Sequence, residues 1–149
     1  PARYADDHAE HRDRAAEIVA VGTREAEVFA AIEAKTAAWE SAGITISAAG
    51  RSIVMGASPA DRATLDQYRS QLDRETATAT SINGIPIVLR GKDGVAVPMT
   101  ALQARDRITA YGREAFRREA LRINWQSAAQ AATNVSELDA IAAQVSAVA

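Results

Sequence analysis

Two histidines, His8 and His11, are the first residues to examine for chemistry, because they stand three apart with Asp7 and Glu10 beside them. On a helix, residues three apart share one face, and such a pair can bind a transition-metal ion. A metal site also needs a third ligand and a shielded environment. The surrounding residues are polar and offer nothing to bury. We therefore expect a solvated helix start here and no metal site.

Three aspartates, Asp61, Asp66 and Asp73, are the next candidates, for acid–base catalysis. Such catalysis needs carboxylates held together in a cleft with shifted pKa values. Asp61 falls in a predicted first helical turn, where the helix dipole favours an acid, and the other two have arginines at helical spacing. The chain also has no cysteine and no glycine-rich phosphate loop. We expect no catalytic residues, no cofactor and no enzymatic activity.

The stretch from Arg105 to Arg122 holds six arginines against three acidic residues, whereas residues 1–40 hold nine acids and five bases. Arginine binds phosphate well, but a chain of net charge −2 does not indicate a nucleic-acid binder. Opposite charges on two long helices favour packing of one helix against the other, within one chain or between copies. The sequence leaves open whether the arginine face binds protein or phosphate.

Apolar residues at steps of three, four and seven run along residues 15–39 and predict one long helical stripe. Because 35 residues are alanine, we expect too little large apolar surface elsewhere in the chain to cover this stripe. The stripe therefore predicts self-association or partner binding, with a late tryptophan as a further anchor. The predicted interface comprises Ile18, Val21, Val28, Phe29, Ile32, Trp39 and Trp125.

The predicted fold is α+β and mainly α, with helix above half of the residues. A helix of about 30 to 35 residues ends at Gly43, and a proline-initiated helix, a long helix and a short last helix follow at 59–76, 101–131 and from 135. Their starts carry capping signals: Ser58 before the first, Thr100 with Gln103 at the second, and Asn134 with Glu137 at the third. Two short hairpins, at 44–55 and 85–99, are expected to form one small antiparallel sheet packed by two or three further helices. Residues 1–42 form an N-terminal leader and helical stem or arm, and residues 43–149 a small α+β domain.

The long third helix is expected to bury one apolar face. That face comprises Leu102, Ile108, Tyr111, Ala115, Phe116 and Ile123.

Several of these features together resemble an uncharacterised domain found at the C-terminal end of phage tail-fibre and tail-associated proteins. The similarity runs over about residues 36–141. Its most specific parts are the segment Val97–Ala101 entering a long helix and the closing segment Thr133–Ile141, and the Asp93-Gly94 turn also matches. Members often carry a tryptophan just before that turn, where this chain has Val88-Leu89-Arg90.

The resemblance implies a structural, non-enzymatic virion protein of the phage tail or tail-fibre region, located in host cytoplasm during assembly. Its expected partners are copies of itself, in threefold- or sixfold-related symmetry, and other tail proteins; no membrane and no nucleic acid is expected. Two alternatives stay open, a transient tail-fibre assembly chaperone or adaptor, and an unrelated bacterial helical protein-binding module. The family has no established catalytic residues, so the resemblance assigns none.

Overall fold

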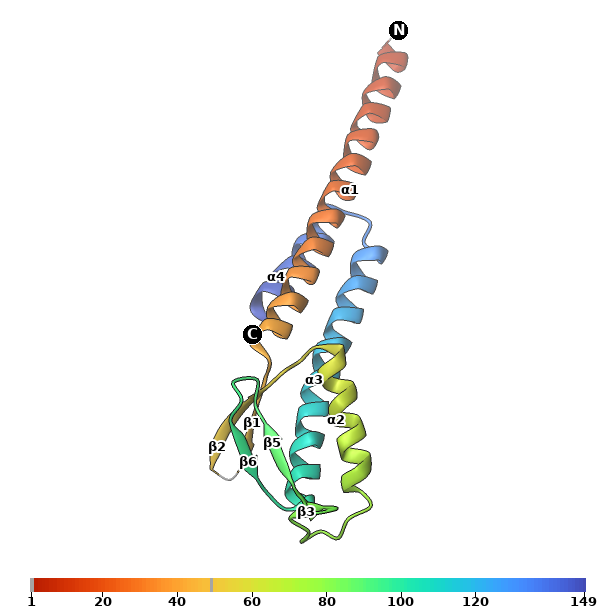
Figure 1. Ribbon diagram of the computed structural model, residues 1–149. Coiled ribbons are helices and arrows are strands. Elements are labelled where there is room, and N and C mark those ends of the chain that lie inside the picture. Colours follow the sequence, from red (N-terminus) through yellow and green to blue (C-terminus); the bar gives the residue numbers. More distant parts are fainter. Residues whose placement is uncertain (1, 49) are drawn as a thin grey trace. The chain divides into compact units, whose positions relative to one another are not determined.

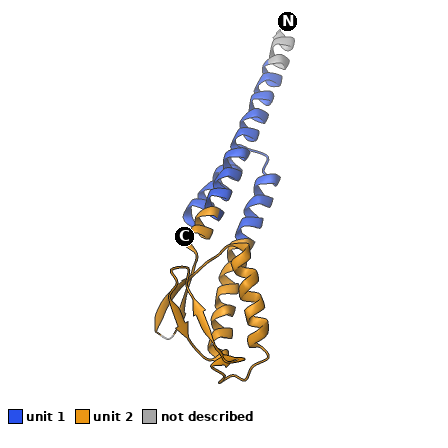
Figure 2. Ribbon diagram, in the orientation of Figure 1, with its two compact units in different colours: residues 1–36, 120–149 blue, residues 37–119 orange. Residues whose placement is uncertain are grey.

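The computed structural model describes the backbone of residues 2–48 and 50–149 and the side chains from residue 9 onward, residue 49 excepted. Within these residues the chain is 66% helical, with four helices and three short hairpins (Figure 1). The predicted α+β, mainly α class is confirmed. The chain divides into two compact units: unit 1 comprises residues 1–36 and 120–149, and unit 2 comprises residues 37–119 (Figure 2). The predicted boundary between residues 42 and 43 stays a prediction, because compactness does not show which segments fold alone.

Unit 1 is built from helices. α1 spans Ala2–Ala42 and contributes its residues up to Thr36; α3 spans Ala101–Ala131 and contributes its last turns; α4 spans Val135–Ala147. α1 is longer than predicted, at 41 residues. The unit buries large apolar residues from all three helices against one another: Val28, Ile32, Trp125, Leu138, Ile141 and Val145.

The start and the position of α4 follow from specific polar contacts. Asn134 caps the helix by accepting from the backbone N–H of Glu137 at 2.9 Å, as its sequence predicts. Asp139 accepts from Arg24 Nε at 2.8 Å, which ties α4 to α1. Lys35 donates to the backbone carbonyl of Val148 just after the last turn. These contacts place α4 along the apolar face of α1.

Unit 2 begins with the predicted hairpin of β1 (Ile44–Ala48) and β2 (Arg51–Met55). Ile44 pairs with Met55, and Ile46 with Ile53, in an antiparallel register. Alternate residues of β1 are buried, as a strand with one face on a core requires. Helix α2 (Pro59–Leu72) follows, with the predicted serine cap and N-terminal proline, and it ends four residues before the expected position.

The remaining strands correct the prediction of a single sheet. β3 (Ser81–Ile82) pairs with β4 (Ile85–Pro86), and β5 (Val88–Arg90) pairs with β6 (Ala96–Pro98), so the described residues form three separate two-stranded sheets. The chain changes strand partner at Ile87, whose N–H donates to the carbonyl of Thr80 at 2.8 Å and whose carbonyl accepts from the N–H of Met99 at 3.1 Å. One backbone bond links two hairpins, from Lys92 N to Val54 O at 2.8 Å.

The core of unit 2 lies between these hairpins and one face each of α2 and α3. Thr100 and Gln103 form the predicted capping box at the start of α3, with bonds of 3.0 and 3.3 Å. The Tyr111 hydroxyl donates to the carbonyl of Gly56 at 2.7 Å and so joins α3 to the segment before α2. Large buried members of this core are Ile44, Ile53, Leu72, Ile87, Leu89, Ile108 and Tyr111.

Candidate interaction surfaces

The residues predicted as an interface fall into three groups. Four of them, Val28, Ile32, Trp39 and Trp125, are buried inside the chain. Val21 and Phe29 are half-buried, and Ile18 is 67% exposed. An outside partner was expected because the chain was thought to offer too little large apolar surface to cover the stripe. At Val28 and Ile32 this reason does not hold, because unit 1 covers both side chains completely. An interface role stays a prediction for the exposed end of the stripe.

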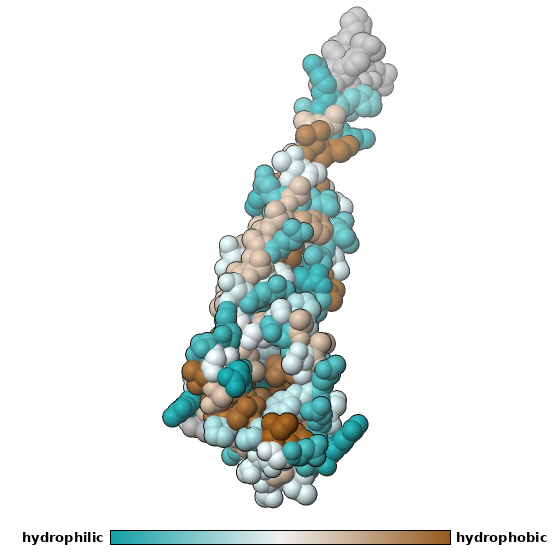
Figure 3. Space-filling view, in the orientation of Figure 1, coloured by the Kyte–Doolittle hydropathy of each residue, from teal (hydrophilic) through white to brown (hydrophobic). Residues whose placement is uncertain are grey.

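We define the distal segment as residues 9–20 of α1, all of which are exposed. Its two large apolar side chains are Ile18 and Val19, at 67% and 68% exposure. Figure 3 shows hydrophobic colour on this part of α1, next to hydrophilic residues. Because these turns of α1 have no packed apolar face, packing against another surface would stabilise them further.

A shallow groove lies at the base of the distal segment, within unit 1. It has a volume of about 360 Å³ and is lined by Arg14, Glu17, Ile18, Val21 and Thr133. The apolar stripe of α1 continues into this groove, where Val21 is half-buried and Ile18 is 67% exposed. At this groove the buried part of the apolar stripe ends and its exposed part begins.

Trp39 is held in unit 2 by Arg118, a contact that the sequence did not predict. The Arg118 guanidinium donates to the carbonyls of Trp39 at 3.1 Å and Gly43 at 3.0 Å, and lies 5.6 Å from the centre of the Trp39 ring. Its third partner is Glu114, at 3.1 Å, in the pair expected from their spacing of four. A cation at a helix C-terminus interacts favourably with the helix dipole. Arg118 thus anchors the end of α1 to α3.

Glu114 is the acidic centre of this cluster. Arg117 donates two hydrogen bonds to it, at 2.8 and 2.9 Å, and Arg118 a third. Bonding to Arg117 and then to Arg118 lowers the pKa of Glu114, against an opposing effect of burial. The folded protein therefore stabilises the ionised form of Glu114.

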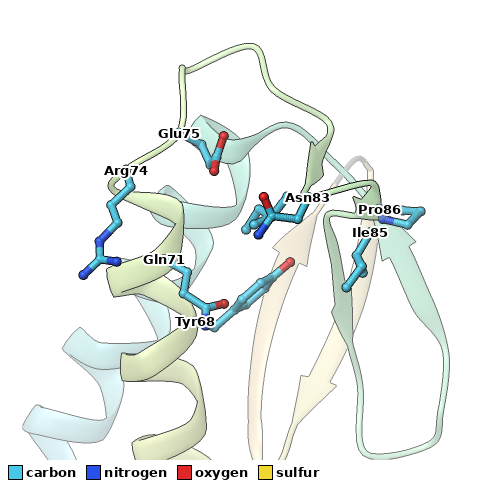
Figure 4. A pocket seen from close by; sticks show the side chains of 8 residues that line it. Tyr68, Gln71, Arg74, Glu75, Asn83, Ile85 and Pro86 are labelled. Atoms are coloured by element: carbon cyan, nitrogen blue, oxygen red, sulfur yellow. The ribbon is translucent and has the colours of Figure 1, made fainter.

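A groove of about 400 Å³ lies between α2 and the β3–β4 hairpin. Figure 4 shows Tyr68 and Gln71 on α2, and Asn83, Ile85 and Pro86 on the hairpin side of this groove. Burial raises the pKa of Tyr68, so this phenol stays neutral at physiological pH. Glu75 is the single acidic residue of the lining.

Two of the three aspartates named from the sequence, Asp61 and Asp73, have side-chain partners. Asp61 closes a capping box with Ser58, its carboxylate accepting from the Ser58 N–H at 3.1 Å and the hydroxyl at 2.7 Å. Asp73 lies 3.9 Å from Arg105. Among the residues whose side chains are described, no group of three or more His, Cys, Asp or Glu could hold a metal ion. His8 lies outside those side chains, so the histidine pair cannot be placed.

The apolar face predicted for α3 is partly wrong. Ile108, Tyr111 and Ala115 are buried as expected, but Leu102, Phe116 and Ile123 are exposed at 47%, 75% and 48%. Leu102, Phe116 and Ile123 lie fourteen and seven residues apart, so they share a second face of the helix. Within unit 2, we call Leu102, Thr109 and Phe116 the α3 stripe.

The chain was compared with protein-family models, with curated proteins and with solved structures, and none of them matches it. In the part of the chain that the structure describes, no helix is long and apolar enough to cross a membrane.

Proposed function

We propose that this protein is a structural, non-enzymatic component of a phage tail or tail fibre, which assembles through the distal segment of α1. The observation that carries the proposal is the distal segment itself. It continues a buried apolar stripe into solvent, exposes Ile18 and Val19, and has no covering element among the described residues. Such a helix gains stability when a second surface covers it.

The phage setting rests on the sequence resemblance to tail-associated domains. The closing segment Thr133–Ile141, which carries that resemblance, contains the Asn134 cap of α4 and the buried residues Leu138 and Ile141. α4 covers the proximal part of the α1 stripe and leaves the distal part uncovered. A domain that presents a helical arm in this way suits attachment within an ordered assembly.

Self-association is tested by the double variant Ile18→Glu/Val19→Glu, measured by sedimentation velocity beside the wild-type chain. The wild type is expected to be oligomeric and the variant monomeric, because two charges in an apolar contact cost several kcal/mol. A matched control, Ile85→Glu/Val95→Glu, changes two exposed aliphatic residues of unit 2 and should keep the wild-type mass. A variant that keeps the wild-type mass contradicts assembly through the distal segment.

The phage assignment is tested by quantitative mass spectrometry of purified particles from a host that carries the corresponding phage or prophage. A fixed copy number that is a multiple of three or six supports a tail component. Presence in infected-cell lysate but absence from particles overturns the virion role and favours an assembly chaperone. Absence from both favours a bacterial helical binding module.

A further inference from the structure

The α3 stripe exposes two large apolar side chains, Leu102 at 47% and Phe116 at 75%, with the half-buried Thr109 between them. Leu102, Thr109 and Phe116 recur every seven residues, and Phe116 is the most exposed large apolar residue among those described. Residues at heptad spacing stay on one side of a helix, as the residues at a coiled-coil seam do. The stripe is therefore shaped to receive another helix lengthwise.

Two arginines border this stripe. Arg113 lies three residues before Phe116, and Arg117 lies four residues after Arg113, so both are neighbours on the same helix surface. Both side chains are exposed, and Arg117 also bonds Glu114 at 2.8 Å. Acidic residues on an occupant would complement these two arginines, whereas two copies of this surface packed in parallel would place like charges opposite each other.

The distal segment of a second copy has the complementary pattern. Asp13 and Glu17 stand one turn apart, as Arg113 and Arg117 do, and both are exposed. Beside them, Ala16 and Ala20 form a flat row of small residues flanked by Val19. Small side chains let a second helix approach closely, which gives a large ring such as that of Phe116 a surface to cover. In such a contact the apolar residues of the two helices face each other, and the acidic residues face the arginines.

We propose that the distal segment of one copy docks on the α3 stripe of the next, with Asp13 and Glu17 facing Arg113 and Arg117. This inference rests on the proposed assembly through the distal segment and names the surface that receives it. The two surfaces differ, so the contact is heterologous, and repetition of it closes a ring or grows a filament. A ring is the arrangement that a threefold or sixfold tail part requires.

The test mixes two full-length variants, each with one damaged surface. Val19→Glu damages the distal segment, and Phe116→Glu damages the α3 stripe. Each variant alone is expected to be monomeric in sedimentation velocity, and an equimolar mixture should form a one-to-one dimer and nothing larger. That dimer joins the intact distal segment of the Phe116→Glu chain to the intact stripe of the Val19→Glu chain. Circular dichroism confirms that both variants keep the wild-type helix content.

The alternatives give different masses. If Phe116→Glu keeps the wild-type oligomer while Val19→Glu is monomeric, the α3 stripe is not the receptor and the proposed assembly through the distal segment survives. If both variants keep the wild-type mass, or if the wild type is itself monomeric, both proposals fail. If both variants are monomeric and the mixture stays monomeric, a heterologous contact is excluded.

The charge match is tested separately. Arg113→Glu/Arg117→Glu should weaken association at least about tenfold, and adding Asp13→Arg/Glu17→Arg to the same chain should restore it. Raising the salt concentration from 50 mM to 500 mM should weaken the wild-type contact and leave the apolar part of it in place. If the swapped chain does not recover, these four residues do not face each other.

Discussion

Replacing Arg118 with alanine should destabilise unit 2 strongly, because one side chain there satisfies three acceptors. Arg118 is only 11% exposed and donates to the carbonyls of Trp39 and Gly43 and to Glu114 at 3.0–3.1 Å. Hydrogen bonds from charged groups contribute about 1.5 to 3 kcal/mol each, but the freed carbonyls can be partly rehydrated after truncation. Adding the helix-dipole and cation–π contributions, we expect a loss of about 2 to 4 kcal/mol in the free energy of unfolding.

The assay is equilibrium unfolding in urea, followed by tryptophan fluorescence in a Trp125→Phe background so that Trp39 alone reports. Arg118→Lys keeps the charge but cannot fork onto both carbonyls, so it should lose about half as much. Arg117→Ala is the matched control. Its side chain bonds the same Glu114 but is 48% exposed, so it should lose about 1 kcal/mol or less. If Arg118→Ala loses no more than Arg117→Ala, Arg118 does not anchor α1.

Three further predictions concern stability. Ile32→Ala should lower the free energy of unfolding of unit 1 by about 2 to 5 kcal/mol, measured by urea unfolding, because Ile32 is fully buried; a loss below 1 kcal/mol would contradict its burial. The folded-state pKa of Glu114 is below its ordinary value of 4.5, so the stability it contributes is complete above pH 4.5 and is lost as the pH falls through the folded-state pKa. Glu114→Gln should therefore flatten the acid limb of a thermal-melting profile, and an unchanged limb would refute this. Gly43→Ala should cost at least about 1 kcal/mol, because φ is +76° and the added Cβ would lie 2.4 Å from the carbonyl oxygen of Met55; a neutral Gly43→Ala melt would be the contrary result.

Local signals in the sequence predicted the helices and their ends well. Ser58 with Asp61, Thr100 with Gln103, and Asn134 with Glu137 all make the capping bonds that their spacing indicates. Gly43 ends α1 with its N–H bonded to Trp39 O at 3.0 Å. Such contacts join residues three or four apart, so the spacing of the residues in the sequence is enough to predict them.

Long-range packing was harder to predict. The burial of Val28 depends on α4, more than a hundred residues away, and the alanine content alone suggested that the chain could not provide such cover. On α3 the apolar residues divide between two faces, and periodicity alone does not say which face meets the core. Leu102 and Phe116 were therefore assigned to the wrong side. The α3 stripe could be defined only from the structure, which shows which face of α3 packs in the core.

Hydrogen exchange of the distal segment is the most direct test of assembly through α1. The amides of residues 9–20 are followed by mass spectrometry in the full-length protein, at concentrations below and above that at which it associates. The proposed function predicts rapid exchange in the dilute protein and slower exchange in the associated one, with Ile18→Glu/Val19→Glu exchanging rapidly at both. Equal exchange of residues 9–20 at every concentration, in a protein that associates, would contradict the account.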